Sequence, residues 1–330
     1  MPAPSQNDAD ECFVDPILPT NPANSQGLDS SALSDLSSKD KPWDKHRGNA
    51  DRVQHHYWNS AEFKAYAQRV SECAQLLEFN PTAPDENGER KLKLSSARFC
   101  RVRHCPVCQW RRSLMWKAKA YKVLPKIVEK YPKHRWLFMT LTVRNCRITE
   151  LRDTLQHMNK SFRKMTRRKT WPATGWLRSV EVTRGRDGSA HPHFHCLLMV
   201  KSSYFTHGYI KQAEWVETWR SCLKVDYNPV MNIQAIRKKS QPMQLVPELL
   251  KYCTKESDLV ADQGWFLELT RQMHKLQCIA TGGVLKQYLR ELEQEPDDLI
   301  GESDEPEQAD EDFSLYFGWR RSEKRYRLNG

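Results

Sequence analysis

Residues 190–200 read AHPHFHCLLMV, with three histidines at alternate positions that lead directly into an apolar run. Alternate side chains of a β-strand point to the same face, so His193 and His195 are expected side by side, about 7 Å apart along the backbone. Two imidazoles at this spacing suit one divalent metal ion, and with a carboxylate they can hold Mg²⁺ or Mn²⁺ against a phosphate oxygen. The same residues also fit a polar strand edge whose histidines are structural, so the surrounding sequence has to decide between the two.

The hydrophobic periodicity around this strand predicts an α+β fold. The order βαββαβα is typical of a central antiparallel β-sheet with helices packed on one side, which leaves the other face free for nucleic acid. Trp215 and Trp219, four residues apart on one helix, are expected in the core. The predicted elements other than the histidine strand are a strand at 135–143, a helix at 148–168, a strand at 175–184, a turn at 185–188, a helix at 211–224, a strand at 230–236 and a helix at 243–256.

Length and composition predict a soluble, cytoplasmic protein. A chain of 330 residues with 39% hydrophobic residues allows one or two domains with a sizeable core. No run of 18 apolar residues occurs, and the first residues lack the charged and apolar regions of a secretion signal. The ten cysteines are therefore expected to be thiols or metal ligands. No Gly-x-x-x-x-Gly-Lys-Ser/Thr loop is present, so ATP-driven unwinding is not encoded here.

The net charge of +11 hides a strong segregation along the chain. Residues 1–50 carry 8 acidic and 4 basic groups, and residues 291–312 carry 12 acidic groups and no Lys or Arg. Residues 51–290 hold 43 Lys and Arg against 20 Asp and Glu, a net charge of +23. A surface of this kind attracts a polyanion by counterion release, and a nucleic acid backbone is the usual partner. A solvated lysine-rich face is the alternative.

Composition predicts five consecutive parts of the chain. The ends contain too few large apolar residues to fold alone. We therefore expect a disordered N-terminal tail at 1–50, a basic Cys-rich DNA-binding segment of zinc type at 51–130, a larger domain at 131–290, an acidic linker at 291–312 and a basic aromatic C-terminal tail at 313–330. The resemblance described below assigns the catalytic role to the domain at 131–290.

A cysteine cluster within residues 98–112 indicates a structural zinc site. Cys100, Cys105 and Cys108 follow the spacing C-x4-C-x2-C, which can wrap a tetrahedral Zn²⁺ if a fourth ligand arrives from elsewhere. Cys73 is the nearest upstream candidate, and His104 is the alternative; a cluster of reduced thiols without metal is also open. Four nearby arginines are expected to contact DNA phosphates: Arg101, Arg103, Arg111 and Arg112.

Residues 247–258 read PELLKYCTKESD and contain a candidate nucleophile. If this segment is helical, Glu248, Tyr252 and Lys255 lie at i, i+4 and i+7 on one face. A tyrosine beside a lysine can act as a nucleophile, because a nearby cation favours the phenolate. A tyrosine half buried between helix and sheet is the structural alternative.

Three motifs in this order resemble those of the rolling-circle replication initiator (Rep) proteins of small bacterial plasmids. They are FMTLTVRN at 138–145, HPHFH at 191–195 and Lys251-Tyr252-x-x-Lys255. Those proteins are single-tyrosine endonucleases of the His-hydrophobic-His (HUH) superfamily, and the segment 100–112 also resembles their cysteine-rich stretch. The resemblance covers about residues 65–290 and implies an HUH endonuclease domain with an RRM- or ferredoxin-like βαββαβα sheet.

The resemblance implies a catalytic Mg²⁺ or Mn²⁺ bound by His193 and His195, with Phe194 turned into the core between them. Relatives complete such a site with an acidic or polar side chain, and Glu181, on the preceding strand across the turn, is our choice. Glu181 as the buried partner of an arginine is the alternative. His191 is expected at the surface.

The resemblance further implies the reaction. Tyr252 attacks the scissile phosphate of the plasmid origin, leaving a 5′-phosphotyrosyl link and a free 3′-hydroxyl primer, with Lys255 favouring the phenolate. Glu248, four residues before the tyrosine, matches a glutamate thought to activate water in the second cleavage that ends replication. Double-stranded and single-stranded origin DNA and a host helicase, single-strand binding protein and DNA polymerase are the partners implied.

Other functions are compatible with the same residues. An HUH-type transposase or relaxase would share the motifs, although a relaxase usually carries a helicase domain or a longer histidine cluster, and the sequence contains neither. A non-enzymatic zinc-containing DNA-binding regulator would use the histidines structurally and would bind DNA without cleaving it.

Overall fold

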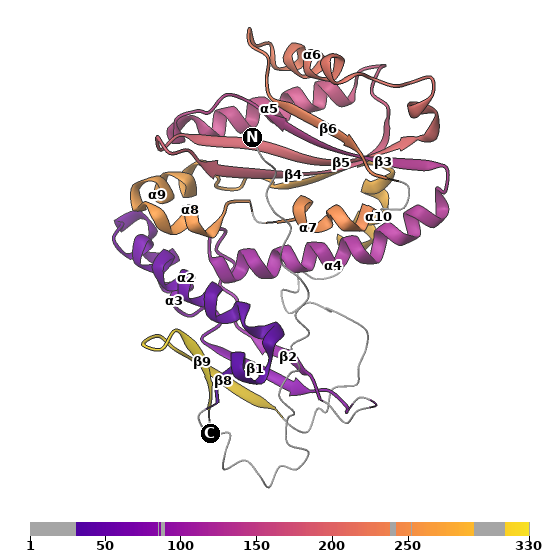
Figure 1. The fold of residues 1–330 in the computed structure, drawn as a ribbon. Helices are drawn as coiled ribbons and strands as arrows, with labels where there is room; N and C mark the ends of the chain where they lie inside the picture. The colour runs from indigo at the N-terminus through magenta and orange to yellow at the C-terminus, as the bar shows by residue number, and fades with distance from the viewer. Residues whose placement is uncertain are drawn as a thin grey trace, which may run out of the picture. The chain divides into compact units, whose positions relative to one another are not determined.

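The structure is a computed structural model that describes residues 31–293 and 314–329, except residues 85, 87–89, 238–241 and 252; of residues 290–293 it describes the backbone alone. The chain divides into two compact units, and each is described by itself (Figure 1). The first comprises residues 1–48, 72–99 and 305–330, and the second comprises residues 49–71 and 100–304. Within the described residues, no helix is both long enough and apolar enough to cross a membrane.

A four-stranded antiparallel sheet forms the first unit, in the strand order β2-β1-β8-β9. Its core is aromatic: the rings of Phe79 and Phe317 meet edge-on with centroids 5.8 Å apart, and the rings of Trp319 and Tyr326 lie 5.1 Å apart. The elements are α1 (Leu33–Leu36), η2 (Ser38–Asp40), the start of α2 (Pro42–Trp58), β1 (Leu76–Pro81), β2 (Leu92–Ala97), β8 (Leu315–Arg320) and β9 (Arg325–Leu328).

Segments from both expected tails take part in this unit, which differs from the organisation that composition predicts. Ala32 forms an isolated β-bridge with Arg327, and Leu33 is completely buried. Sparse apolar residues suffice here, because they pack on strands contributed by a distant part of the chain. Residues 31–50 and 314–329 are thus folded. Residues 1–30 and 294–313, which contain most of the predicted acidic linker, lie outside the described residues.

The second unit is built around a five-stranded antiparallel sheet in the order β6-β3-β5-β4-β7. Its strands are β3 (His134–Thr142), β4 (Ala173–Arg184), β5 (Ala190–Lys201), β6 (Met231–Ala235) and β7 (Ile279–Gly283). Its helices after the end of α2 are η3 (Ala61–Phe63), α3 (Lys64–Ser71), α4 (Pro106–Lys130), η4 (Ile148–Glu150), α5 (Leu151–Thr166), η5 (Ser202–Phe205), α6 (Gln212–Leu223), η6 (Pro242–Leu245), α7 (Val246–Leu249), α8 (Glu256–Ala261), α9 (Gln263–Gln272) and α10 (Val284–Glu293).

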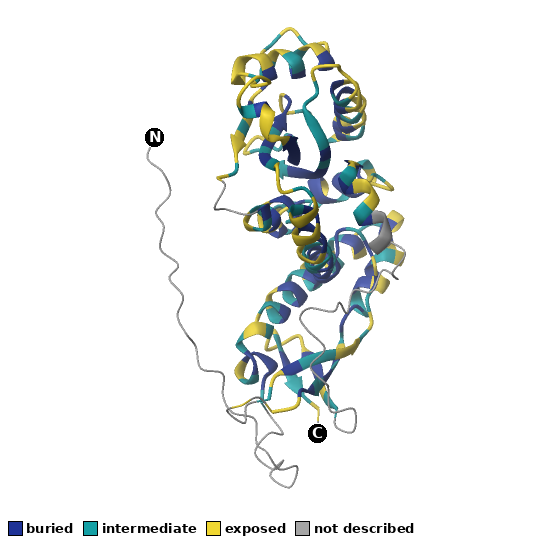
Figure 2. Ribbon diagram, turned by 90° about the vertical axis from the view of Figure 1, so that its right-hand side faces the viewer, coloured by how far each residue is buried: buried dark blue, intermediate teal, exposed yellow. Residues whose placement is uncertain are grey.

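The α+β class, the antiparallel sheet and the order of its elements from β3 to β6 are confirmed. Each predicted strand lies within two residues of its expected bounds, and the predicted core residues Trp215 and Trp219 are 1% and 0% exposed. The turn between β4 and β5 uses Gly188 at a φ of 80°, a left-handed conformation that favours glycine. This hairpin is the longest pairing of the sheet, and its strands are largely buried (Figure 2).

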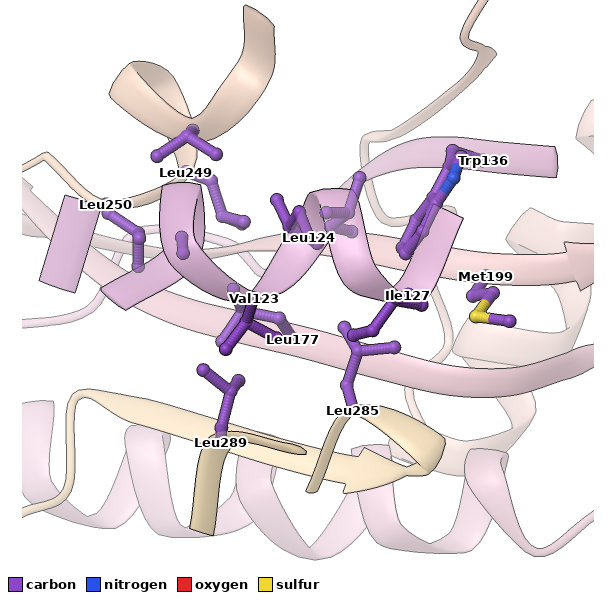
Figure 3. Packing of buried hydrophobic residues seen from close by; sticks show 13 residues of the cluster. Val123, Leu124, Ile127, Trp136, Leu177, Met199, Leu249, Leu250, Leu285 and Leu289 are labelled. Atoms are coloured by element: carbon purple, nitrogen blue, oxygen red, sulfur yellow. The ribbon is translucent and has the colours of Figure 1, made fainter. Parts of the chain in front are cut away.

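Helices cover both faces of this sheet, so the expectation of helices on one side and a bare face for nucleic acid is wrong (Figure 1). On one face, the α5 side chain Phe162 packs edge-on against Phe194, with ring centroids 6.1 Å apart. On the other, α4, α7 and α10 pack against Leu197 and Met199 in one hydrophobic cluster (Figure 3). The cause lies in β5, where residues 197–200 are four consecutive apolar residues and therefore present apolar side chains to both faces.

The helix predicted over residues 243–256 is also wrong. A short helix, α7, ends at Leu249, and none of the described residues between it and the start of α8 is helical. Lys255, directly before α8, has an extended backbone (φ −62°, ψ 140°). Between α7 and α8 the Cys253 carbonyl accepts a hydrogen bond from the Val182 amide at 2.8 Å. Because this segment bonds to the end of β4 instead of to its own preceding turn, Glu248 and Lys255 do not share the face of one helix.

We expect Leu285→Ala to lower the free energy of unfolding by about 2–5 kcal/mol, because the side chain is completely buried under the sheet and its removal leaves a cavity. Leu285 lies so close to β4 that a Cβ on Gly175 would meet its Cδ1 at 2.5 Å. Urea denaturation measures the loss, and Val230→Ala, at a residue that is 75% exposed, is the matched control. Equal stability of the two variants would contradict the second helical layer.

Candidate functional site

Three side chains that can bind a metal meet on the β4–β5 hairpin. The strand register places Glu181 directly opposite His193 and places Ser179 opposite His195. The Nε2 atoms of His193 and His195 lie 3.0 and 2.9 Å from the same oxygen, Oε2 of Glu181. The candidate ligand atoms all lie within 4.8 Å of one another. The structure therefore brings together the three residues that the sequence suggested as metal ligands.

Neighbouring groups fix the orientation of the two imidazoles. The ring of Phe138 on β3 stacks on His195 at a centroid distance of 5.7 Å, and Thr140 Oγ1 lies 3.4 Å from His195 Nδ1. His193 Nδ1 lies 3.4 Å from the carbonyl oxygen of His191. In this geometry Nε2–H of each ring donates to Glu181 Oε2. A neutral imidazole that carries its proton on Nδ1 instead, beside these oxygens, has a free lone pair on Nε2, which is the form that binds metal.

Two residues of the segment after η6 complete the site. Lys251 Nζ lies 2.9 Å from Glu181 Oε2 and 2.6 Å from Glu248 Oε1. Glu248 Oε1 is in turn 3.9 Å from His195 Nε2, and the Glu248 side chain is 48% exposed. The sequence pattern predicts a role for Glu248 in this site but none for Lys251, although Lys251 directly precedes Tyr252. One feature of the sequence could have indicated it: the motif Lys-Tyr-x-x-Lys contains two lysines, of which Lys251 is the first.

The electrostatics of the cluster centre on the Glu181 carboxylate, whose side chain is 3% exposed. Burial alone would raise its pKa, but hydrogen bonds from His193, His195 and Lys251 outweigh burial and hold the pKa of Glu181 well below its usual range. Burial would lower the pKa of Lys251, and its bonds to Glu248 and Glu181 raise it instead. Glu181 is therefore an anion at neutral pH, as a metal ligand must be.

The donor set fits a divalent metal ion with catalytic access. Two imidazole nitrogens and one carboxylate oxygen make three ligands, so further coordination positions remain for oxygen atoms of a substrate. Glu181 as the buried partner of an arginine is excluded among the described residues, because its ion-pair partners there are His193, His195 and Lys251.

The candidate nucleophile, Tyr252, lies outside the described residues. The residues on either side of it are tied to the fold. Ser113 Oγ of α4 donates to the Leu250 carbonyl oxygen at 2.7 Å, and the Val182 amide of β4 donates to the Cys253 carbonyl oxygen at 2.8 Å. Lys255 is exposed at the start of α8. Leu250 and Cys253, which flank this position in the sequence, are therefore bonded to α4 and to the strand that carries Glu181.

The four cysteines predicted to bind zinc come together. The Sγ atoms of Cys73, Cys100, Cys105 and Cys108 all lie within 4.8 Å of one another, and all four residues are buried. The Cys100 and Cys108 sulfurs are 3.6 Å apart, close to the ~3.8 Å between sulfurs bound to one tetrahedral zinc ion at ~2.3 Å. His104, the alternative ligand, is not part of this group. Its ring nitrogens have no hydrogen-bond partner among the described residues, and burial lowers its pKa to about 3.

The arginines next to this cluster differ in accessibility. Arg101 is exposed and has a positive φ of 55°. Arg103 is partly buried and donates to the Leu276 carbonyl oxygen at 2.7 Å and to Cys278 Sγ at 3.0 Å. Arg111 is 9% exposed and lies over the Trp110 ring, and Arg112 is partly exposed. Of the four, Arg101 is the most accessible to a DNA phosphate.

A second basic surface lies at the C-terminal end of α5, and we call it the α5 basic surface. Its residues are exposed, and the structure shows no ion pair between them and any described residue. α5 covers the sheet face of Phe194, whereas His193 and His195 point to the opposite face. The surface comprises Lys160, Arg163, Lys164, Arg167, Arg168 and Lys169.

Known proteins match this chain over most of its length. The family described as "Replication protein" matches residues 91–327. A "Protein rep" of Lactiplantibacillus plantarum is 37% identical over 289 residues, which cover 82% of this chain and 88% of the relative. A "Protein rep" of Bacillus amyloliquefaciens is 32% identical over 337 residues, which cover 91% and 98%. No solved structure matches the chain.

These matches define the class as DNA replication proteins, consistent with a basic body and a candidate site for phosphate chemistry. The chain belongs to the replication-protein family, as a plasmid replication initiator of the Rep type. Initiators of this family are generally nicking endonucleases, and initiation implies binding of plasmid origin DNA.

We expect the triple variant Arg163→Gln, Lys164→Gln, Arg167→Gln to weaken DNA binding. If each residue neutralises one phosphate of duplex DNA, the slope of log affinity against log salt becomes shallower by about 2.7. Fluorescence anisotropy of labelled origin duplex at several salt concentrations measures the slope.

Arg147→Gln is the control for this measurement, because the Arg147 guanidinium is already paired with Glu150 at 2.6 Å. An unchanged slope in the triple variant would show that the α5 basic surface does not contact DNA.

Proposed function

We propose that this initiator nicks one strand of the plasmid double-strand origin with Tyr252 as nucleophile, at a divalent metal ion bound by Glu181, His193 and His195. One observation carries the proposal: these three ligands adjoin Glu248 and Lys251, in the segment that leads directly into Tyr252. We also propose that the five-stranded sheet and its two layers of helices form an HUH endonuclease domain of the RRM- or ferredoxin-like type.

The chain's own residues supply the metal site and its orientation. A bound Mg²⁺ or Mn²⁺ would polarise the scissile phosphate and stabilise the charge that develops on its oxygens. Glu181 supplies an anionic ligand, and the sheet holds both imidazoles at fixed positions through Phe138 and Thr140. The low exposure of the ligands keeps competing water away from them.

In the first cleavage, Tyr252 loses its phenolic proton and its oxygen attacks the phosphorus atom. The bond from phosphorus to the 3′ oxygen breaks, and the 3′ oxygen takes up a proton, which balances the one that the phenol loses. The products are a 5′-phosphotyrosyl link and a 3′-hydroxyl that primes synthesis. The pKa of tyrosine is ordinarily about 10, so a neighbouring cation is needed to favour the phenolate at neutral pH. Lys255 supplies this charge in our proposal.

Termination needs a second cleavage and the joining of strands. Glu248 is suited to activate water for that step: its carboxylate is half exposed, and its Oε1 atom lies 3.9 Å from His195 Nε2. Water activated in this way would free the protein after a round of replication. A single tyrosine and one carboxylate then perform the two cleavages.

The cysteine cluster is proposed as a structural Zn²⁺ site of Cys73, Cys100, Cys105 and Cys108. Four thiols would fill all four coordination positions of a tetrahedral zinc ion, so none would remain for a substrate. In this respect the cysteine cluster differs from the proposed catalytic metal site. Arg101, Arg103, Arg111 and Arg112 are proposed to place positive charge toward DNA beside it.

The reaction also implies partners and a compartment. A 3′-hydroxyl primer requires a host DNA polymerase, the displaced strand requires a single-strand binding protein, and separation of the strands requires a host helicase. These proteins act in the bacterial cytoplasm, where we place this initiator.

We expect Tyr252→Phe to lose nicking of supercoiled origin DNA in the presence of Mn²⁺ by at least about a thousandfold, because the variant has no oxygen to attack phosphorus. The assay follows conversion to open circles and the protein–DNA adduct, whose labelled peptide is identified by mass spectrometry. Tyr209→Phe, at an exposed tyrosine, is the matched control.

Recovery of the DNA on another peptide would overturn the assignment of Tyr252. DNA binding without any nick would favour a zinc-containing regulator, and strand transfer between two ends would favour an HUH-type transposase.

We expect Cys108→Ser to reduce the zinc content of the purified protein from about one ion per chain to nearly none, because the serine hydroxyl is a poor zinc ligand. Elemental analysis by mass spectrometry gives the ratio. Cys222→Ser changes a buried cysteine outside the cluster and should keep its zinc. A wild-type protein without zinc would refute the structural site.

A further inference from the structure

Lys251 occupies an unusual position at the centre of the candidate metal site. Its Nζ atom lies 2.9 Å from Glu181 Oε2, the same oxygen that His193 and His195 contact. It also lies 2.6 Å from Glu248 Oε1. Among the described residues, Lys251 is the one Lys or Arg side chain that pairs with Glu181.

The burial of Glu181 explains why a cation is needed there. A buried carboxylate without a positive partner is strongly destabilising, and the Glu181 side chain is only 3% exposed. Without a divalent ion, the Lys251 ammonium group is the positive charge that balances Glu181.

We propose that Lys251 is a built-in cation that competes with the divalent metal for Glu181. It stabilises the site without metal, releases Glu181 when the metal binds, and keeps its contact with the more exposed Glu248. This inference rests on the proposed metal site. It makes Lys251 a positioning residue that acts through Glu181.

The geometry makes the competition direct. An ammonium group has three donors and no lone pair, so it cannot become a metal ligand as the imidazoles can. A metal bonded to Glu181 Oε2 at about 2.1 Å would sit next to Lys251 Nζ, and two cations at that separation repel each other. His193 and His195 can stay in place when the metal binds. The proton of each ring can then be on Nδ1, where a neighbouring oxygen accepts the hydrogen bond.

The release of Lys251 is confined to its side chain. The carbonyl oxygens of Leu250 and Cys253 are held by Ser113 and Val182, so the backbone on both sides of Lys251 and Tyr252 is fixed. Glu248, which retains Lys251, is 48% exposed. Metal binding would therefore shift one positive charge from the buried carboxylate of Glu181 toward the more exposed carboxylate of Glu248.

The test is the affinity of the full-length protein for Mn²⁺ without DNA, measured by isothermal titration calorimetry at constant ionic strength. We expect Lys251→Met to bind Mn²⁺ about tenfold more tightly than the wild type, because the competing charge is gone. Lys251→Arg keeps the charge and should stay close to the wild type. Lys160→Met removes a lysine from the opposite side of the sheet and should not change the affinity.

A second readout follows from linkage between binding and folding. Without metal, Lys251→Met should melt at a lower temperature than the wild type, and saturating Mn²⁺ should raise its melting temperature by more. If Lys251→Met does not fold, Lys251→Gln gives the same comparison, because it also lacks the charge.

Two outcomes would overturn the inference in different ways. Equal or weaker Mn²⁺ affinity in the uncharged variants, with normal affinity in the wild type, would refute the role of Lys251 alone. A wild type that binds no Mn²⁺ would refute the proposed metal site, and the role of Lys251 with it.

Discussion

The buried carboxylate of Glu181 is the interaction on which the candidate site depends. It sits on the longest hairpin of the sheet, opposite His193, and three donors converge on one of its oxygens. Its negative charge is stable at that depth only because those donors are present. A single atom, Glu181 Oε2, thus couples three features of the site. They are the register of β4 and β5, the rotamers of the histidines and the position of Lys251 in the segment before Tyr252.

Much of this arrangement could be predicted from the sequence because strand geometry is regular. Alternation places His193 and His195 on one face, and a short turn with Gly188 brings the preceding strand alongside with Glu181 in register. The clustered spacing of Cys100, Cys105 and Cys108 was similarly informative, since thiols three residues apart at a helix start converge by local geometry.

Predictions failed where tertiary contacts override local preference. Residues 243–256 have helical periodicity, but the hydrogen bond between Val182 and Cys253 takes the chain out of the helix. No local pattern encodes such a bond. The second layer of helices could have been predicted from the sequence, since residues 197–200 place apolar side chains on both faces of β5. The pairing of β1 with β8 joins residues more than 200 positions apart, which periodicity cannot reveal. For the same reason Lys251 was missed: its importance comes from a contact across the fold.

Helix α4 fixes both the distance and the rotation between the cysteine cluster and the Ser113 side chain that binds Leu250. It begins right after Cys105, contains Cys108, and five residues later presents Ser113 to the Leu250 carbonyl. An α-helix advances ~1.5 Å and turns ~100° with each residue, so one inserted residue between Cys108 and Ser113 would rotate the hydroxyl away from its acceptor. Side chains on the outer surface of α4 can vary during evolution, but the number of residues between the thiols and the serine cannot.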